Sequence, residues 1–166
     1  MRVIQVNVEG ITDTKKFLES IRSSKYKIEA LSYAKYLEEN GLVLRATDPS
    51  KPLIPSGTKV DLSTHVIKAE EFAKTINDEI AHLYTLRSRG KQLIELLPDY
   101  RAQAVMRLYY IDFVPWKEVS RQIHVSPSRL YELRRIAIFQ LNDKIRAARL
   151  RQLTKLIKQV AVAKPH

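Results

Sequence analysis

The chain of 166 residues contains no cysteine and only four glycines, and both shortages exclude kinds of site. Without cysteine there is neither a disulfide nor a zinc site with thiolate ligands. No glycine-rich loop that cradles phosphate groups is present, and neither a Ser-His-Asp set nor a carboxylate pair is suggested by position. The four histidines lie too far apart in the sequence for any two to share a helix face; they are His65, His82, His124 and His166. We therefore expect no metal, no cofactor and no enzymatic activity.

Long apolar runs are also missing. No stretch of about 18 apolar residues, the length that a membrane-spanning helix needs, occurs in the sequence. The first residues, "MRVIQVNVEGITD", lack the apolar core of a signal peptide. We expect a cytoplasmic protein that does not enter a membrane. Its length suits one compact domain, or a small domain with an extended helical element.

Acidic residues become scarce after residue 98. Residues 1–98 carry 15 Lys/Arg against 13 Asp/Glu, whereas residues 99–166 carry 14 against 5. Most of the net charge of +11 therefore belongs to the C-terminal part. Such asymmetry is typical of proteins that bind a polyanion, because neutralised phosphates release their condensed counterions.

The first half of the chain is expected to form a long, coiled-coil-like helical hairpin, preceded by a short strand within residues 1–13. Apolar residues at helical spacing predict a helix from about Thr14 to Leu44, with a stop signal at Asn40-Gly41. A loop rich in proline should follow at 45–61, because its three prolines and one glycine do not suit a helix interior. A second helix opens near Ser63 and closes at Pro98-Asp99.

The second helix carries apolar residues at alternating steps of three and four, the spacing of a coiled-coil seam. Two interpretations are open. The hairpin is a self-contained spacer, or it pairs with a second chain or another protein, which we slightly favour. In the second case the oligomerisation residues, which follow Val66 in the seam, are Ala69, Ala73, Ile76, Ile80 and Leu83.

Three further helices are predicted between Tyr100 and about Leu150. The first spans 101–112, the second has Pro115 in its first turn, and the third has Ser126 as N-cap and Pro127 as its first residue. The residues expected to form their buried faces are Ala104, Val105, Leu108 and Ile111, then Trp116, Val119 and Ile123, then Leu130, Leu133, Ala137 and Leu141.

The second and third of these helices have the pattern of a helix-turn-helix. Ser120 is the small residue needed where the helices cross closely, and Val125 is the apolar plug of the turn. The turn position itself often holds a left-handed glycine, but here it is His124, which costs on the order of 1 kcal/mol. With Leu130 and Leu133 buried, the residues left facing outward are Pro127, Ser128, Arg129, Tyr131, Glu132, Arg134 and Arg135. Such a face suits DNA, although Arg129, Glu132 and Arg135 are also spaced to form ion pairs on a solvated helix.

The segment "AQAVMRLYYIDFVPWKEVSRQIHVSPSRLYELRRIAIFQL" resembles the C-terminal helix-turn-helix, region 4, of sigma-70-type sigma factors. More closely, it is similar to phage late transcription regulators of the ArpU/RinA type. The likeness covers residues 101–141, is looser over 52–98 and does not extend to residues 1–30. It implies DNA binding and transcriptional control of phage genes.

By position, the resemblance implies that Ser128 and Glu132 reach base edges, and that Arg129 and Arg135 bind bases or phosphates. Glutamate accepts from the cytosine amino group and arginine donates to guanine, so these residue types suit the major groove. The resemblance further implies that the backbone N–H of Ser126 binds a phosphate and that Lys117 and Arg121 bind the DNA backbone. Tyr131 would touch a thymine methyl or a phosphate, unless it packs on the preceding helix. Arg134 is expected to face outward and is counted among the DNA-binding residues.

The tail from Lys144 to the C-terminus has seven basic residues and no acidic one, with apolar residues at roughly helical steps. Three interpretations compete: a helix packed on the body or on a partner subunit, an arm along the DNA backbone, and a membrane-surface helix. The membrane is disfavoured because the apolar face has no Trp or Phe anchor.

These predictions combine into an all-α protein with two parts: a helical hairpin over 1–98, and a helix-turn-helix with a basic helical tail over 99–166. The leading hypothesis is a sequence-specific regulator of transcription that binds double-stranded DNA, as a homodimer or together with RNA polymerase. The alternatives are a DNA-packaging subunit of the small-terminase kind and an accessory protein that binds RNA polymerase through the hairpin.

Overall fold

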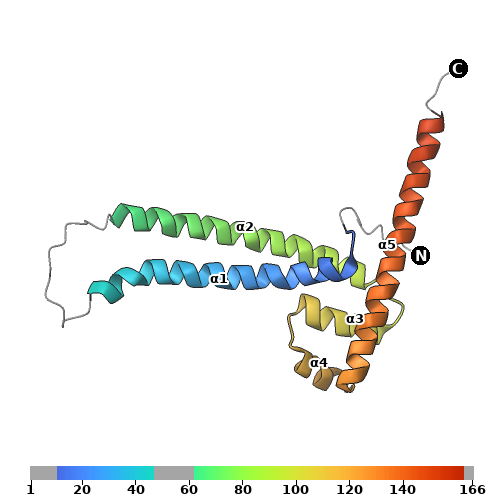
Figure 1. The fold of residues 1–166 in the computed structure, drawn as a ribbon, viewed down its shortest axis with the longest axis horizontal. Coiled ribbons are helices and arrows are strands. Elements are labelled where there is room, and N and C mark those ends of the chain that lie inside the picture. Colours follow the sequence, from blue (N-terminus) through green and yellow to red (C-terminus); the bar gives the residue numbers. More distant parts are fainter. Residues whose placement is uncertain (1–10, 47–61, 163–166) are drawn as a thin grey trace. The chain divides into compact units, whose positions relative to one another are not determined.

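The computed structural model describes residues 11–46 and 62–162, and every element in these residues is a helix (Figure 1). The elements are α1 (Thr14–Ala46), α2 (Leu62–Ile94), α3 (Tyr100–Met106), the π-helix η1 (Arg107–Ile111), α4 (Trp116–Ile123) and α5 (Pro127–Val162). The predicted all-α fold is confirmed. The strand expected within residues 1–13 and the loop expected at 45–61 lie largely outside the described residues.

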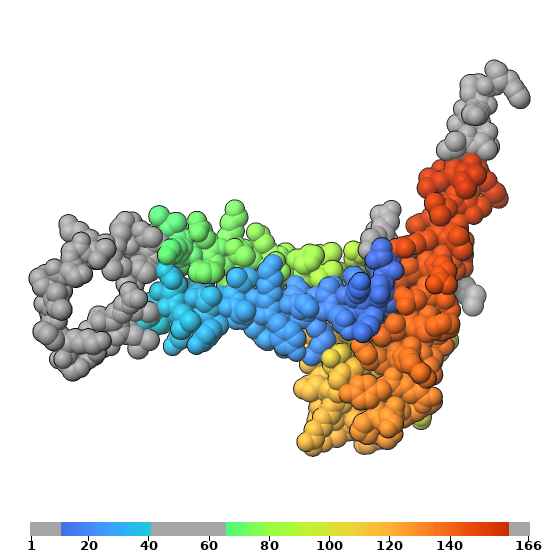
Figure 2. All heavy atoms as spheres, viewed as in Figure 1, coloured from blue at the N-terminus to red at the C-terminus, as the bar shows by residue number. Residues whose placement is uncertain are grey.

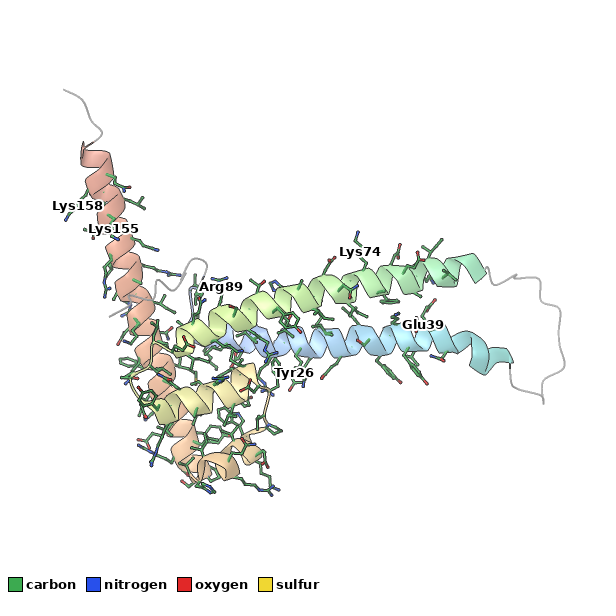
Figure 3. The ribbon with its side chains drawn as sticks, turned by 180° about the vertical axis from the view of Figure 1, so that it is seen from behind. Tyr26, Glu39, Lys74, Arg89, Lys155 and Lys158 are labelled. Carbon is green, nitrogen blue, oxygen red and sulfur yellow. The ribbon has the colours of Figure 1, made fainter. Side chains whose placement is uncertain are left out.

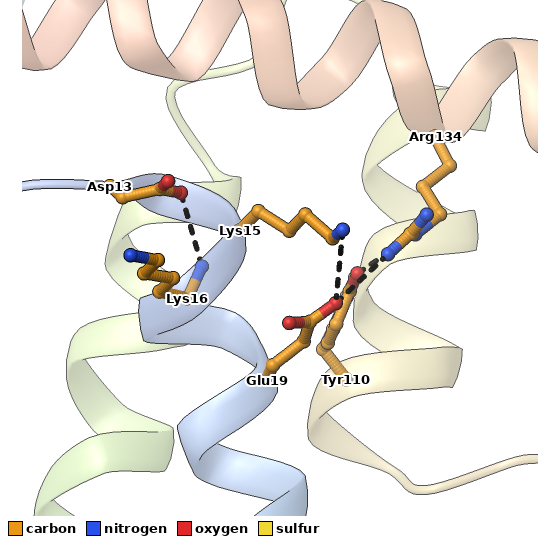
Figure 4. A network of polar contacts seen from close by, with 6 residues as sticks. All are labelled: Asp13, Lys15, Lys16, Glu19, Tyr110 and Arg134. Atoms are coloured by element: carbon orange, nitrogen blue, oxygen red, sulfur yellow. Dashed lines mark hydrogen bonds and ion pairs between the residues drawn. The ribbon is translucent and has the colours of Figure 1, made fainter.

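The helix α1 begins at Thr14 because two side chains cap it. The Asp13 carboxylate accepts a hydrogen bond from the backbone N–H of Lys16 at 3.1 Å, as Figure 4 shows. From α5, Asn142 Oδ1 accepts from the backbone N–H and the hydroxyl of Thr14 at 3.1 and 2.6 Å. The first turn of α1 is thereby fastened to α5.

The predicted stop at Asn40-Gly41 is wrong, because α1 continues through both residues to Ala46. The Asn40 side chain donates to the carbonyl of Tyr36, one turn back, at 2.8 Å. A glycine in a helix costs roughly 1 kcal/mol, and the leucines that follow Gly41 favour the helix.

The chain forms two compact units. Among the described residues, unit 1 holds 11–22 and 85–162, and unit 2 holds 23–46 and 62–84. The division differs from the expected one at residue 98, because the chain's first helical turns and the end of α2 pack with the C-terminal helices. At the unit boundaries, residues 1–22 and 85–166 carry 21 Lys/Arg against 9 Asp/Glu, and residues 23–84 carry 8 against 9. The excess of positive over negative charge is therefore confined to unit 1.

In unit 2, α1 and α2 run side by side in opposite directions (Figure 1). Two ion pairs fix the alignment: Lys27 with Glu79, and Glu38 with Lys68 at 3.7 Å. From the first pair to the second, the residue number rises by eleven on α1 and falls by eleven on α2, as an antiparallel arrangement requires. Of the unit 2 residues whose burial is described, only Ser24 is buried. The helical hairpin is present, but its residues of described burial form no closed apolar core of their own.

Unit 1 has a buried apolar core. Gly90 of α2 is buried where α1 and η1 come close, since a Cβ there would lie 2.6 Å from Ile21 Cδ1 and 2.8 Å from Ile111 Cδ1. The residues of the core that are less than 2% exposed include Ile11, Leu18, Ile21, Leu93, Val105, Met106, Tyr110, Ile111, Val119, Leu130 and Leu141. This core supports the C-terminal helices, including both that flank the predicted turn.

The segment predicted as one helix over 101–112 is α-helical only to Met106 and then becomes the π-helix η1. The backbone N–H of Asp112 donates to the carbonyl of Arg107, five residues earlier, at 3.0 Å. Phe113 follows with a φ of 60°, and Pro115 is the extended cap before α4 rather than a residue of its first turn. Within η1, the rings of the sequence neighbours Tyr109 and Tyr110 lie edge to face.

Candidate nucleic-acid interface

The turn between α4 and α5 is left-handed at the predicted position. His124 has φ 55° and ψ 45°, and its N–H donates to the Arg121 carbonyl at 3.3 Å. The N–H of Val125 donates to the Ser120 carbonyl at 3.2 Å. These two bonds are the pair that defines a Schellman motif. The Ser120 hydroxyl donates a third hydrogen bond, to the Val125 carbonyl at 2.6 Å, which further fixes the turn.

The start of α5 also follows the sequence prediction. Pro127 is the first helical residue, where its missing N–H is harmless. The Ser126 hydroxyl accepts a hydrogen bond from the backbone N–H of Arg129 at 3.3 Å, which makes Ser126 the N-cap. The direction in which α5 leaves the turn is thus set by local bonds.

A small apolar cluster holds α4 and α5 together. Its buried residues are Val105, Val119, Leu130 and Leu133, and six half-buried residues pack around it: Leu108, Tyr109, Val114, Trp116, Ile123 and Val125. Further along α5, Ala137 and Leu141 are buried too. The predicted core faces of α4 and α5 are confirmed, and the opposite face of each helix is left to solvent.

Most of the predicted DNA contacts lie on that solvent-exposed face. The exposed residues of this group are Lys117, Arg121, Ser126, Ser128, Arg129, Tyr131, Glu132 and Arg135. Ser128, Glu132 and Arg135 follow one another at steps of four and three, so they share one side of α5. Arg129 lies beside them.

Two ion pairs neutralise part of this face. Arg129 pairs with Glu132 at 2.7 Å and Arg121 with Glu118 at 3.2 Å, each within one helix. The alternative interpretation of a solvated, ion-paired face is confirmed for Arg129 and Glu132, whereas Arg135 makes no ion pair among the described residues. Exposed pairs are worth at most about 1 kcal/mol, so a phosphate or a base can displace either acid.

Arg134 does not face outward, contrary to the sequence prediction. Its side chain is 24% exposed and pairs with Glu19 of α1 at 3.4 Å. Its Nε donates to the hydroxyl of Tyr110 at 2.8 Å, and Figure 4 shows the three side chains converging. Burial raises the pKa of Tyr110, against the opposing effect of the arginine. Arg134 is therefore a structural residue that fixes α5 to α1 and η1.

An aromatic column links the same elements, and the sequence did not reveal it. The rings of Tyr109 and Trp116 stack at a centroid distance of 3.8 Å, and Tyr131 lies 5.5 Å from Trp116. Arg22 of α1 covers the other side of Tyr109 at 4.0 Å. Tyr131 thus packs on the preceding helix while 54% of it stays exposed. Helical spacing within one segment could not predict stacking among residues of four separate elements.

The predicted oligomerisation residues lie in unit 2. Ala69, Ala73, Ile76, Ile80 and Leu83 are half-buried, while Val66 is exposed. Their partial burial occurs within one chain, where α2 lies beside α1. Pairing with a second chain through these residues stays a prediction.

The tail continues α5 without a break to Val162. Among the residues of α5 whose burial is described, Ile145 is the last buried one, and every residue from Leu150 to Gln159 is exposed. Lys155 and Lys158 extend from this part, as Figure 3 shows. As far as residue 159, packing on the chain's own body therefore covers only the first turns of the tail.

Other kinds of site have no support in the described residues. Within 11–46 and 62–162, no three acidic or histidine side chains are grouped closely enough to hold a metal ion. None of the described helices is both long and apolar enough to cross a membrane.

Comparison of the chain with protein-family models, with curated proteins and with solved structures gives no match.

Proposed function

We propose that the protein is a sequence-specific regulator of transcription that binds double-stranded DNA and inserts the first turns of α5 into the major groove. One observation carries the proposal. Ser128, Glu132 and Arg135 share an exposed side of α5, while Leu130, Leu133 and Ala137 anchor the other side in the core. Polar groups on a rigidly held helix are what reading of base edges requires.

The residue types divide into two roles. Arg135 and Arg129 donate to guanine or phosphate, and Glu132 accepts from a cytosine amino group. Lys117 and Arg121 are exposed on α4 and bind phosphates, which sets the register of α5 in the groove. The excess of basic residues in unit 1 supplies the long-range attraction, and unit 2, with 8 Lys/Arg against 9 Asp/Glu, contributes none.

The assignment to transcription rests on the resemblance of residues 101–141 to region 4 of sigma factors and to ArpU/RinA-type phage regulators. A partnership with RNA polymerase on DNA belongs to the same proposal, and so does a homodimeric state of the protein when it is free of DNA. The left-handed turn at His124 supports it, since a helix running straight through that residue would exclude the motif.

Selection from a random pool of DNA duplexes, followed by fluorescence anisotropy at several salt concentrations, tests the proposal. We expect one enriched sequence, bound at least about a thousand times more tightly than scrambled duplexes. Affinity that is the same for all duplexes and falls steeply with salt would contradict specific binding.

The phosphate-binding role can be tested by substitution. Lys117→Ala should weaken binding to all duplexes alike and reduce the salt dependence by about one phosphate contact. Lys74→Ala removes the same charge from an exposed position in unit 2 and should leave affinity unchanged (Figure 3). Equal losses in both variants would show that only net charge matters.

A further inference from the structure

The helix α5 has two apolar faces, and the structure covers only one of them. The covered face is formed by Leu130, Leu133, Ala137, Leu141 and Ile145. The opposite face carries seven residues at regular steps of three and four: Ile136, Phe139, Asp143, Arg146, Leu150, Leu153 and Ile157. We call these seven residues the α5 seam.

The α5 seam is exposed along its whole length. Phe139 is 66% exposed, Leu150 59%, Leu153 54% and Ile157 68%. In the space-filling view of Figure 2, the red part of α5 stands free of other coloured residues on the face drawn. Steps of three and four kept over about three heptads are the sequence pattern of a coiled coil, in which a second helix buries such a seam.

The C-terminal turns of α5 give an independent reason to expect a partner. From Leu150 to Gln159 no residue is covered by the rest of the chain. In proteins most of the stability of a helix comes from the tertiary packing of one of its faces, which these turns lack within the chain. A second helix along the α5 seam would supply the missing contacts.

The charges in the middle of the α5 seam select the partner and its direction. Asp143 and Arg146 lie next to each other in the seam, and their side chains are 51% and 77% exposed. In a parallel pair of α5 helices, Asp143 would face Asp143 and Arg146 would face Arg146, which brings like charges together. In an antiparallel pair, each Asp143 faces the other copy's Arg146.

The apolar residues of the α5 seam match in the same antiparallel register. When Asp143 lies opposite Arg146, Phe139 lies opposite Leu150, and Ile136 lies opposite Leu153. The same register therefore pairs apolar with apolar and acid with base in every layer from Ile136 to Leu153. A polar layer within an apolar seam is a known device for fixing register and orientation.

We propose that the α5 seam is the contact surface for a second copy of this chain, paired as an antiparallel two-helix coiled coil. The surface is self-complementary, as a two-fold symmetric dimer requires. It differs from the α2 residues that the sequence indicated for oligomerisation. The proposal goes beyond DNA binding and does not depend on it.

Pairing through the α5 seam also affects DNA binding, a consequence that rests on the proposed function. In the antiparallel register, Ile157 of one copy lies opposite Glu132 of the other. The last turns of each α5 then run along the face that carries Ser128 and Arg135, where DNA is proposed to bind. Pairing through the α5 seam and DNA binding by the same copy are therefore mutually exclusive.

Sedimentation velocity of the full chain over a wide concentration range tests the pairing. We expect a reversible monomer–dimer equilibrium that Asp143→Arg and Arg146→Asp each shift to monomer. The combined exchange, Asp143→Arg with Arg146→Asp, should restore the dimer, because only antiparallel pairing makes the exchanged charges complementary. Circular dichroism verifies that each variant keeps its helix content.

Paired substitutions of matched exposure provide the control. Leu150→Ala with Leu153→Ala should abolish the dimer, whereas Val66→Ala with Ile67→Ala should leave it intact, since those two residues of unit 2 are 53% and 54% exposed. A chain that stays monomeric at all concentrations, a ring of eight or more subunits, or a dimer that survives loss of Leu150 and Leu153 would overturn the proposal.

The absence of cysteine allows a direct test of direction. Phe139→Cys and Leu150→Cys chains, mixed and oxidised, should form the mixed disulfide in preference to either homodimer, and self-linking at residue 139 would overturn the antiparallel register. In a separate experiment with the wild-type chain, which has no cysteine, adding the selected duplex should convert dimer to DNA-bound monomer. If pairing is found but no DNA binds, only the proposed function fails; if DNA binds a chain that never pairs, only this inference fails.

Discussion

The Nε of Arg134 in α5 donates a hydrogen bond to the hydroxyl of Tyr110 in η1 over 2.8 Å. The same guanidinium pairs with Glu19 of α1 and lies 5.8 Å from the centre of the Trp116 ring. One side chain thereby connects α5 to α1, η1 and α4. The exposed arginines on either side, Arg129 and Arg135, have no comparable structural role.

Replacing Arg134 should therefore cost stability rather than only binding. Arg134→Ala removes a hydrogen bond to a charged donor, and we expect a loss of about 1.5–3 kcal/mol in the free energy of unfolding. Arg129→Ala is the matched control and should change it by less than about 0.5 kcal/mol, because its ion pair is exposed. Urea titrations measure both values. Equal losses for the two variants would contradict a structural role for Arg134.

The Tyr110 hydroxyl should make stability depend on alkaline pH. Burial raises its pKa above the ordinary value of 10.0, so the folded state holds the proton more tightly than the unfolded state does. Its contribution is fully present below about pH 10 and is lost as pH rises through the folded-state pKa. Tyr110→Phe removes the group, so the stability difference between wild type and variant should shrink above pH 10. A difference that stays constant with pH would disprove this dependence.

The left-handed turn predicts a stabilising substitution. His124→Gly relieves the steric cost of a φ of 55° and should raise the free energy of unfolding by about 1 kcal/mol. Gln122→Gly, two residues earlier and inside α4, should lower it by about 0.5–1 kcal/mol. Thermal unfolding of the pair measures the contrast, and destabilisation by both glycines would show that His124 makes contacts that outweigh its strain.

Gly90 marks the closest approach of three elements in unit 1. Gly90→Val would place its side chain against the Ile21 and Ile111 methyl groups, both fully buried, and should cost about 1–3 kcal/mol by overpacking. Ser88→Val in the exposed part of the same turn gives the reference for valine in a helix. Similar unfolding midpoints for the two variants would mean that the core yields there without cost.

Local features of the fold could be predicted from the sequence because they depend on neighbouring residues. The start of α1, the N-cap at Ser126, the buried stripe of α5 and the left-handed turn at His124 each follow from spacing or capping within a few residues. The π-helical turn at Arg107–Ile111 could not be predicted, since apolar spacing there also fits an α-helix.

Contacts between distant elements explain why the position of Arg134 and the aromatic column were not predicted. Arg134 lies among outward residues in the sequence pattern, and only the arrival of Glu19 and Tyr110 from α1 and η1 turns it inward. The aromatic column of Tyr109, Trp116 and Tyr131 has the same origin. The predicted stop at Gly41 gave too much weight to the cost of one glycine in a helix and too little to the helix-forming residues that follow it.

The central claim, that the exposed side of α5 reads DNA sequence, is tested most directly by Arg135→Ala. Anisotropy gives the ratio of affinities for the selected and a scrambled duplex, for wild type and for the variant. We predict that this ratio falls by about 5- to 150-fold, the loss of about 1–3 kcal/mol of base discrimination, with an unchanged unfolding midpoint. Arg101→Ala, which removes an exposed arginine from α3, should leave the ratio unchanged. An Arg135→Ala variant that keeps the wild-type ratio would contradict the claim.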